Sequence, residues 1–120
     1  MKKTWLIICA LLSATMINAQ QEIKIEDLDK HTGDSVTVCT KIYGGVFLER
    51  SKDSPTLLNA GGIYPNAPLT LVIWLDTRKQ FKEVPEVFYK DKEICVTGKI
   101  TLYKEKLQIV IYDEKQIVLK

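Results

Sequence analysis

The sequence has few of the residues that carry most catalytic and metal chemistry. Its 120 residues include one histidine and three cysteines. No run of apolar residues approaches the ~20 that a membrane-spanning helix needs. No Ser-His-Asp set, glycine-rich phosphate loop or His-Glu-x-x-His motif is present, and the carboxylates lack the paired spacing of acid–base catalysis. We therefore expect no enzyme, no metal site and no cofactor.

The first nineteen residues have the layout of a secretory signal peptide. Lys2 and Lys3 precede an apolar run over residues 5–12, and a stretch richer in small and polar residues then leads to Ala19. We expect cleavage after Ala19, location in the periplasm or outside the cell, and no stable membrane insertion of the mature chain. Residues 20–120 are then one small domain.

Removal of this peptide would take away the net positive charge. The full chain has 17 basic and 15 acidic side chains. The mature chain loses two lysines, so it has 15 side chains of each sign. A non-specific nucleic-acid binder normally has a clear basic excess, because counterion release drives its affinity. Only a local basic surface could therefore support nucleic-acid binding here.

Alternation of apolar and polar residues predicts most of the strands. The alternation is strict in residues 35–43 and 93–102, which is typical of half-buried strands. Gly44 and Gly45 interrupt the first of these, as a bend or bulge would. The expected strands cover residues 35–43, 56–60, 69–75, 93–102 and 107–112. Residues 20–33 fit a lead-in strand or turn, and residues 117–119 close the chain.

One short helix is expected between the third and fourth strands. Asp76 or Thr77 can cap its N-terminus, and apolar residues recur at helical spacing over residues 78–89. Pro85 would break a long helix there, so we expect one or two turns. Five antiparallel strands with one helix plugging an end match the OB-fold barrel, an all-β fold that closes its sheet edges.

Several motifs resemble a family of small bacterial OB-fold domains. The clearest are Tyr-Pro-Asn at residues 64–66 and Val-Thr-Gly-Lys-Ile at residues 96–100, and the resemblance covers roughly residues 33–117. These domains are usually described as nucleic-acid-binding-like, and some are found beside extracytoplasmic nucleases. The family tends to have glycine where Thr40 and Glu105 stand in this sequence. The resemblance implies an OB fold with a ligand groove.

Aromatic and basic residues are the best candidates for a binding site. In an OB fold the exposed face near strands two and three, with its flanking loops, is the usual groove, where aromatic rings stack bases and cations hold phosphates. The candidate ligand-binding residues are Tyr43, Arg50, Lys52, Tyr64, Trp74, Tyr103, Lys104 and Lys106. In the structural alternative, Trp74 packs under the helix or a loop and the lysines solvate the surface.

The mature chain has two cysteines, Cys39 and Cys95. An exported chain meets conditions that favour disulfides, and both cysteines lie on the polar side of strands that are neighbours in an OB barrel. Pairing Val38 with Val96 would set Cys39 opposite Cys95. We expect a disulfide between them, with two free thiols or a shared metal as the alternatives.

Three functions remain open at this point. The resemblance favours a non-catalytic exported module that binds single-stranded DNA or RNA weakly. The near-zero charge favours an envelope or stress-related module that binds an exported protein or a small ligand. A third alternative is an accessory partner of an exported nuclease. We take nucleic-acid binding as the leading hypothesis.

Overall fold

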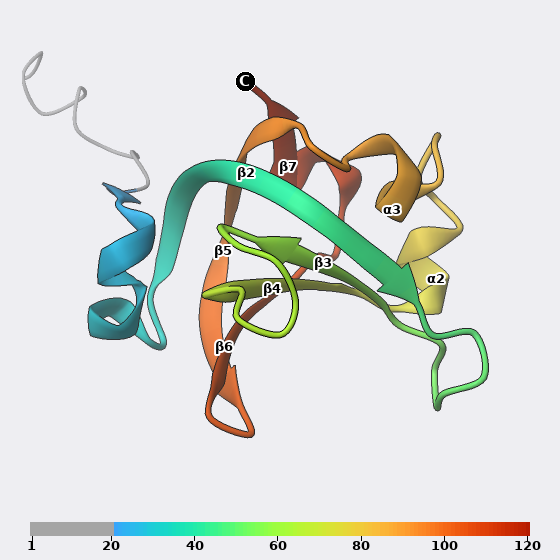
Figure 1. Ribbon diagram of the computed structural model, residues 1–120, viewed down its shortest axis with the longest axis horizontal. Helices are drawn as coiled ribbons and strands as arrows, with labels where there is room; N and C mark the ends of the chain where they lie inside the picture. Colours follow the sequence, from blue (N-terminus) through green and yellow to red (C-terminus); the bar gives the residue numbers. More distant parts are fainter. Residues whose placement is uncertain (1–20) are drawn as a thin grey trace, which may run out of the picture.

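The computed structural model describes residues 21–120, and Figure 1 shows the arrangement of their strands and helices. The expected signal peptide, with its cleavage after Ala19, lies outside the described residues. The seven strands are β1 (Gln21–Ile23), β2 (Ser35–Phe47), β3 (Thr56–Ala60), β4 (Leu69–Ile73), β5 (Glu93–Tyr103), β6 (Lys106–Val110) and β7 (Ile117–Leu119). The helices are η1 (Ile25–His31), α2 (Leu75–Arg78), α3 (Pro85–Phe88) and η2 (Glu114–Gln116). Across residues 21–120, no helix has the length and apolarity to cross a membrane.

Five of the strands form a closed ring. β2 pairs with β3, β3 with β4, β4 with β6, β6 with β5, and β5 returns to β2. This confirms the all-β class and the five expected strands. One expectation is wrong: β4 and β6 run parallel, whereas the other four pairs in the ring are antiparallel. β1 and β7 extend the sheet beside β2 and β5.

β2 is longer than its alternating pattern indicated. It continues past Gly44 to Phe47, and its register against β3 shifts between Ile42 and Gly44. A Cβ atom on Gly45 would lie 2.5 Å from the backbone oxygen of Leu57, so only glycine lets the two strands approach this closely. The glycine pair therefore bends β2 around the ring instead of ending it.

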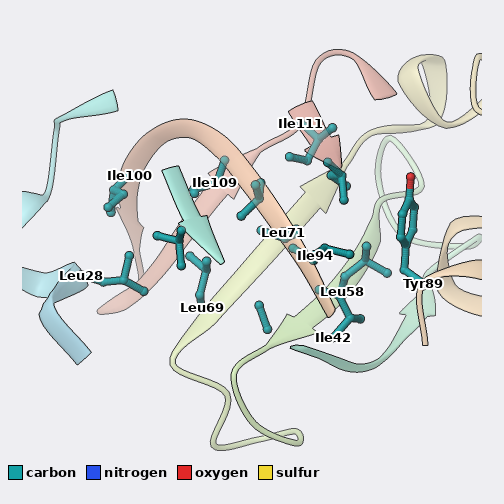
Figure 2. Packing of buried hydrophobic residues seen from close by; sticks show 14 of the residues in the cluster. Leu28, Ile42, Leu58, Leu69, Leu71, Tyr89, Ile94, Ile100, Ile109 and Ile111 are labelled. Atoms are coloured by element: carbon teal, nitrogen blue, oxygen red, sulfur yellow. The ribbon is translucent and has the colours of Figure 1, made fainter. Parts of the chain in front are cut away.

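The core fills the ring and is covered at both ends. Inward side chains such as Leu58, Leu71 and Ile109 are fully buried. Figure 2 shows Leu28 of η1 at one end of this cluster and Tyr89, which follows α3, at the other. The lead-in segment was expected as a strand or turn, and it contains both β1 and the helical turn that supplies Leu28.

The helical region differs from the expectation. Two four-residue helices replace one, and β4 ends at Ile73, so the first helix begins at Leu75 with Trp74 as its N-cap. Neither Asp76 nor Thr77 caps it. Pro85 is the first residue of α3, where a missing N–H removes no helical hydrogen bond. Proline therefore starts a helix here instead of breaking one.

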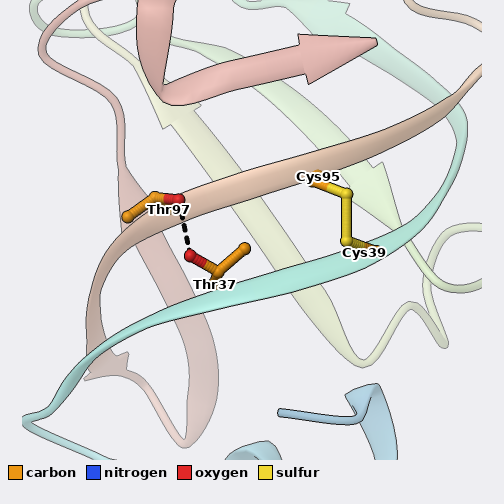
Figure 3. Close-up of a disulfide and its surroundings, with 4 residues drawn as sticks. All are labelled: Thr37, Cys39, Cys95 and Thr97. Atoms are coloured by element: carbon orange, nitrogen blue, oxygen red, sulfur yellow. Dashed lines mark hydrogen bonds between the residues drawn. A yellow bond between two sulfur atoms is a disulfide. The ribbon is translucent and has the colours of Figure 1, made fainter. Parts of the chain in front are cut away.

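The expected disulfide is confirmed. Cys39 of β2 and Cys95 of β5 are directly opposite in the register and bonded, with their Cα atoms 3.9 Å apart (Figure 3). Two residues along, the hydroxyls of Thr37 and Thr97 are hydrogen-bonded at 2.8 Å. The free-thiol and metal alternatives are thus excluded for this pair. A disulfide of this kind is typical of an oxidising, non-cytoplasmic compartment.

Candidate functional site

A groove of about 600 Å³ crosses the outer face of β3, β4 and β6. Its floor includes Asn59, Thr70 and Gln108, the half-buried residues that alternate with the core residues of these strands. Its walls are the end of β2, the loop between β3 and β4, and the hairpin between β5 and β6. The three floor strands lie side by side in the ring in Figure 1.

The β5–β6 hairpin supplies the basic wall. Its two-residue turn consists of Lys104 and Glu105, which have φ values of 49° and 65°. This left-handed pair is the geometry of the tight hairpin turn that glycine and asparagine favour. The turn sets Tyr103, Lys104 and Lys106 along one side of the groove. Lys104 Nζ lies 5.4 Å from the centre of the Tyr103 ring.

The β3–β4 loop supplies a second wall. Tyr64 is 79% exposed and is followed by a cis peptide bond to Pro65, and both residues line the groove. Lys106 Nζ donates a hydrogen bond of 3.5 Å to the carbonyl oxygen of Pro65. The loop and the hairpin are therefore adjacent, and two exposed tyrosines belong to one groove.

The far part of the groove is apolar. Val46 of β2 pairs with Leu57 of β3, and Leu48 follows the end of β2. Val46 is 46% exposed. No carboxylate lines the part of the groove that residues 21–120 form, and its charged lining residues are Lys104 and Lys106. The groove thus combines aromatic, apolar and uncharged polar surface with two cations.

The structure brings together half of the residues that the sequence suggested. Tyr64, Tyr103, Lys104 and Lys106 line this groove, whereas Tyr43, Arg50, Lys52 and Trp74 do not. Arg50 and Lys52 lie exposed in the loop after β2.

Trp74 and Tyr43 have other surroundings. Trp74 lines a separate hollow of about 300 Å³ with Asp53, Leu75 and Asp76. Tyr43 has Lys41 Nζ 4.9 Å from its ring centre. Trp74 is 40% exposed, so it is not packed under a helix or loop either. Its position at the N-cap of α2 takes it away from the groove, because β4 ends one residue earlier.

Sequence reasoning missed the groove floor. Asn59, Thr70 and Gln108 are uncharged, and a search for aromatic and basic residues passes over them. Each lies at an outward position of an expected strand, so alternation alone placed it on an exposed face. The sequence pattern does not show that β4 pairs with β6, and only this pairing brings the three residues together.

A second polar cluster lies where α2 and α3 cover the ring. Arg78 Nη1 donates to Glu86 Oε1 at 2.6 Å and to the buried Thr56 hydroxyl at 2.7 Å, and its guanidinium lies 3.8 Å from the Phe47 ring centre. Burial by itself raises the pKa of Glu86. The hydrogen bond and charge of Arg78, with a backbone hydrogen bond, outweigh this effect and hold that pKa below its ordinary value.

We name these residues the Arg78 cluster: Phe47, Thr56, Arg78 and Glu86. Within the cluster, the Arg78 guanidinium donates hydrogen bonds to both the Glu86 carboxylate and the Thr56 hydroxyl. Across residues 21–120, no three His, Cys, Asp or Glu side chains are grouped as metal ligands would be. His31 lies 3.2 Å from the carboxylate of Asp34 on the surface.

Comparison with known proteins finds likeness at the level of structure. No protein-family model matches the chain, and no curated protein matches it. Among solved structures, it is similar to a candidate aspartyl-tRNA synthetase from Leishmania major Friedlin, at 9% sequence identity and a TM-score of 0.47. The match covers 94% of this chain and 26% of that one, so this chain spans about a quarter of that protein's length.

Proposed function

We propose that the mature chain is an exported OB-fold module whose groove binds single-stranded DNA or RNA without catalysing a reaction. The observation that carries the proposal is the meeting of Tyr64, Tyr103, Lys104 and Lys106 in one groove without a lining carboxylate. The four residues come from two segments about forty residues apart in the chain. The ring of five strands supports the OB-fold interpretation. OB-fold barrels bind oligonucleotides on an outer face of this kind.

The two tyrosines suit the flat faces of bases. Tyr64 and Tyr103 are 79% and 56% exposed, and both line the groove. Stacking of one base on an aromatic ring contributes ~1–3 kcal/mol. The apolar surface of Val46 and Leu57 extends the area against which bases or sugars can pack. A duplex hides its base faces, so the groove favours single strands.

The two lysines suit the phosphate backbone. Lys104 and Lys106 are exposed, and neither forms an ion pair with a carboxylate of residues 21–120. Two neutralised phosphates on a single strand give a slope of log K against log salt of about −1.4. Binding is therefore modest in affinity, which agrees with a mature chain of zero net charge.

A titration of a labelled single strand tests this function. Fluorescence anisotropy would follow an oligonucleotide of about 12 nucleotides, within the range of sites on OB folds, at about 50 to 200 mM salt. We expect saturable binding with the shallow slope given above. The double variant Lys104→Ala, Lys106→Ala should bind weakly and lose the slope.

A charge-matched variant provides the control. Lys79→Ala with Lys82→Ala removes two exposed lysines that lie outside the groove. It should keep both the affinity and the slope of the unmodified protein. Equal losses in the two double variants would contradict a groove site. An absence of binding at the lowest salt would favour the alternative, a protein or small-molecule ligand in the same groove.

A further inference from the structure

The groove floor has a row of polar side chains that stacking and phosphate contacts leave unused. Asn59 of β3 pairs with Thr70 of β4, and Thr70 pairs with Gln108 of β6. The three residues therefore lie in line across neighbouring strands, which are ~4.8 Å apart. All three line the groove. We name them the floor row.

The polar atoms of the floor row are free to meet a ligand. Within residues 21–120, none of these three side chains is hydrogen-bonded to another protein group, and no buried side-chain N or O atom of that part of the chain lacks a partner. The amide and hydroxyl atoms of the floor row must therefore be accessible from the groove. Accessible polar atoms of this kind bond to water, which a ligand with matching donors and acceptors can replace.

Gln116 shows what a structural amide looks like in this protein. Its Nε2 donates to the Thr97 carbonyl at 2.9 Å, and its Oε1 accepts from the backbone N–H groups of Tyr112 and Asp113 at 2.7 and 3.0 Å. Both ends of that amide are used to hold η2 against β5. Gln108 has the same chemistry and a half-buried position, but its amide makes no such bonds within the described part of the chain.

We propose that the floor row reads the edges of bases and makes binding in the groove base-selective. The inference rests on the proposed function and names the specificity-determining residues of that site. A carboxamide presents a donor beside an acceptor, which matches the donor–acceptor pairs on base edges. Stacking alone tolerates every base, because each has a π-face, and phosphate contacts carry no sequence information. Stacking strength gives only modest preferences, so a larger selectivity would come from hydrogen bonds to the floor row.

Homopolymer binding tests the inference. The affinities of unmodified protein for runs of A, C and T of about 12 nucleotides would be measured at one low salt concentration. We expect the best and worst strands to differ at least about fivefold, the lower range for one well-formed amide–base pair. The variant Asn59→Leu, Thr70→Val, Gln108→Met keeps side-chain size and removes the polar atoms. It should still bind, with the ratio reduced to about twofold or less.

Two further variants keep the test decisive. Thr40→Val makes the same hydroxyl-to-methyl change on β2 outside the groove, and it should leave the ratio unchanged. If the triple variant does not fold, Gln108→Met alone carries the test and should lower the ratio at least twofold. Equal affinities of the unmodified protein for all three strands would overturn the inference and leave the proposed function standing. A ratio that survives in the floor-row variants would also overturn it, and a complete lack of binding would overturn both.

Discussion

The Arg78 cluster and the groove hold cations in opposite surroundings. Arg78 is 16% exposed, paired with Glu86, bonded to Thr56 and stacked over Phe47. Lys104 and Lys106 are exposed beside two tyrosines, without a carboxylate in the groove lining formed by residues 21–120. Arg78 is neutralised by a carboxylate inside the protein and holds elements together. Lys104 and Lys106 have no carboxylate partner within residues 21–120, so their charge can bind an anion.

The disulfide, like the Arg78 cluster, stabilises the fold. Its removal should cause the largest loss in the free energy of unfolding. It closes a loop of 56 residues between β2 and β5. Cys39→Ala with Cys95→Ala should lower the free energy of unfolding by about 4 kcal/mol on the chain-entropy model. Urea unfolding of the variant, and of the unmodified protein with reductant, measures this loss. A loss below about 1 kcal/mol would show that the hydrogen bonds of the ring suffice without the bridge.

Breaking the Arg78 cluster should destabilise the protein without affecting ligand binding. Arg78→Met leaves Glu86 largely buried without its partner and the Thr56 hydroxyl without its donor. We expect a loss of about 2–3 kcal/mol, below the range for full burial because the pair is 16% and 18% exposed. Arg78→Met with Glu86→Leu should recover part of this loss. Weaker oligonucleotide binding by the folded single variant would place Arg78 in the site.

Replacing the groove tyrosines should weaken oligonucleotide binding without destabilising the protein. Tyr64→Ala and Tyr103→Ala each remove a stacking surface, so each should weaken single-strand binding by about 1–3 kcal/mol. Their free energies of unfolding should change by less than about 0.5 kcal/mol, because both side chains are exposed. Tyr112→Ala is the matched control, since Tyr112 is 72% exposed outside the groove. Equal binding by all three variants would contradict stacking in the groove.

A substitution in the β5–β6 hairpin turn should raise the free energy of unfolding without removing Lys104 or Lys106. Glu105 has a φ of 65°, a conformation that costs a non-glycine residue roughly 1–2 kcal/mol. Glu105→Gly relieves this cost but loosens the unfolded chain, so we expect a net gain of about 0.5–1 kcal/mol. Glu105→Ala removes the same charge without relieving the backbone. Thermal unfolding that shows equal gains for both variants would assign the effect to charge.

Acid should weaken the Arg78 cluster, because the Glu86 carboxylate of the cluster becomes protonated. The folded-state pKa of Glu86 lies below its ordinary value of 4.5, so its contribution to stability is fully present above that value. The contribution is lost as the pH falls through the folded pKa. Unfolding free energies measured at successive pH values should therefore fall less steeply with acid in Glu86→Gln than in the unmodified protein. Parallel curves would assign the acid sensitivity to other carboxylates.

Local pattern was enough to locate the five strands of the ring, though not all of their ends, and to pair the two cysteines. Strict alternation around Val38 and Val96 favoured the register that brings Cys39 to Cys95, because a slip of one residue would turn the apolar face of the slipped strand outward. The helix boundaries could not be obtained in this way. Pro85 fits either a helix break or a first turn, and only packing under the ring decides between them.

The groove depended on strand order, which local pattern does not contain. Tyr64 and Lys106 lie 42 residues apart and meet because β4 pairs with β6. Trp74 was expected in the site because the predicted strand was extended to residue 75, two residues beyond the end of β4. A residue at the end of a strand has no fixed face, so its side chain could not be placed from periodicity.

The central claim is that the groove, not the rest of the surface, contacts a single strand. Nuclear magnetic resonance of isotope-labelled protein during titration with an oligonucleotide of about 12 nucleotides tests it most directly. We expect the largest shift changes at the side-chain amides of Asn59 and Gln108 and at the backbone of Lys104, with little change at Arg78. Changes centred on Trp74, Arg50 and Lys52, or no changes at low salt, would contradict the account.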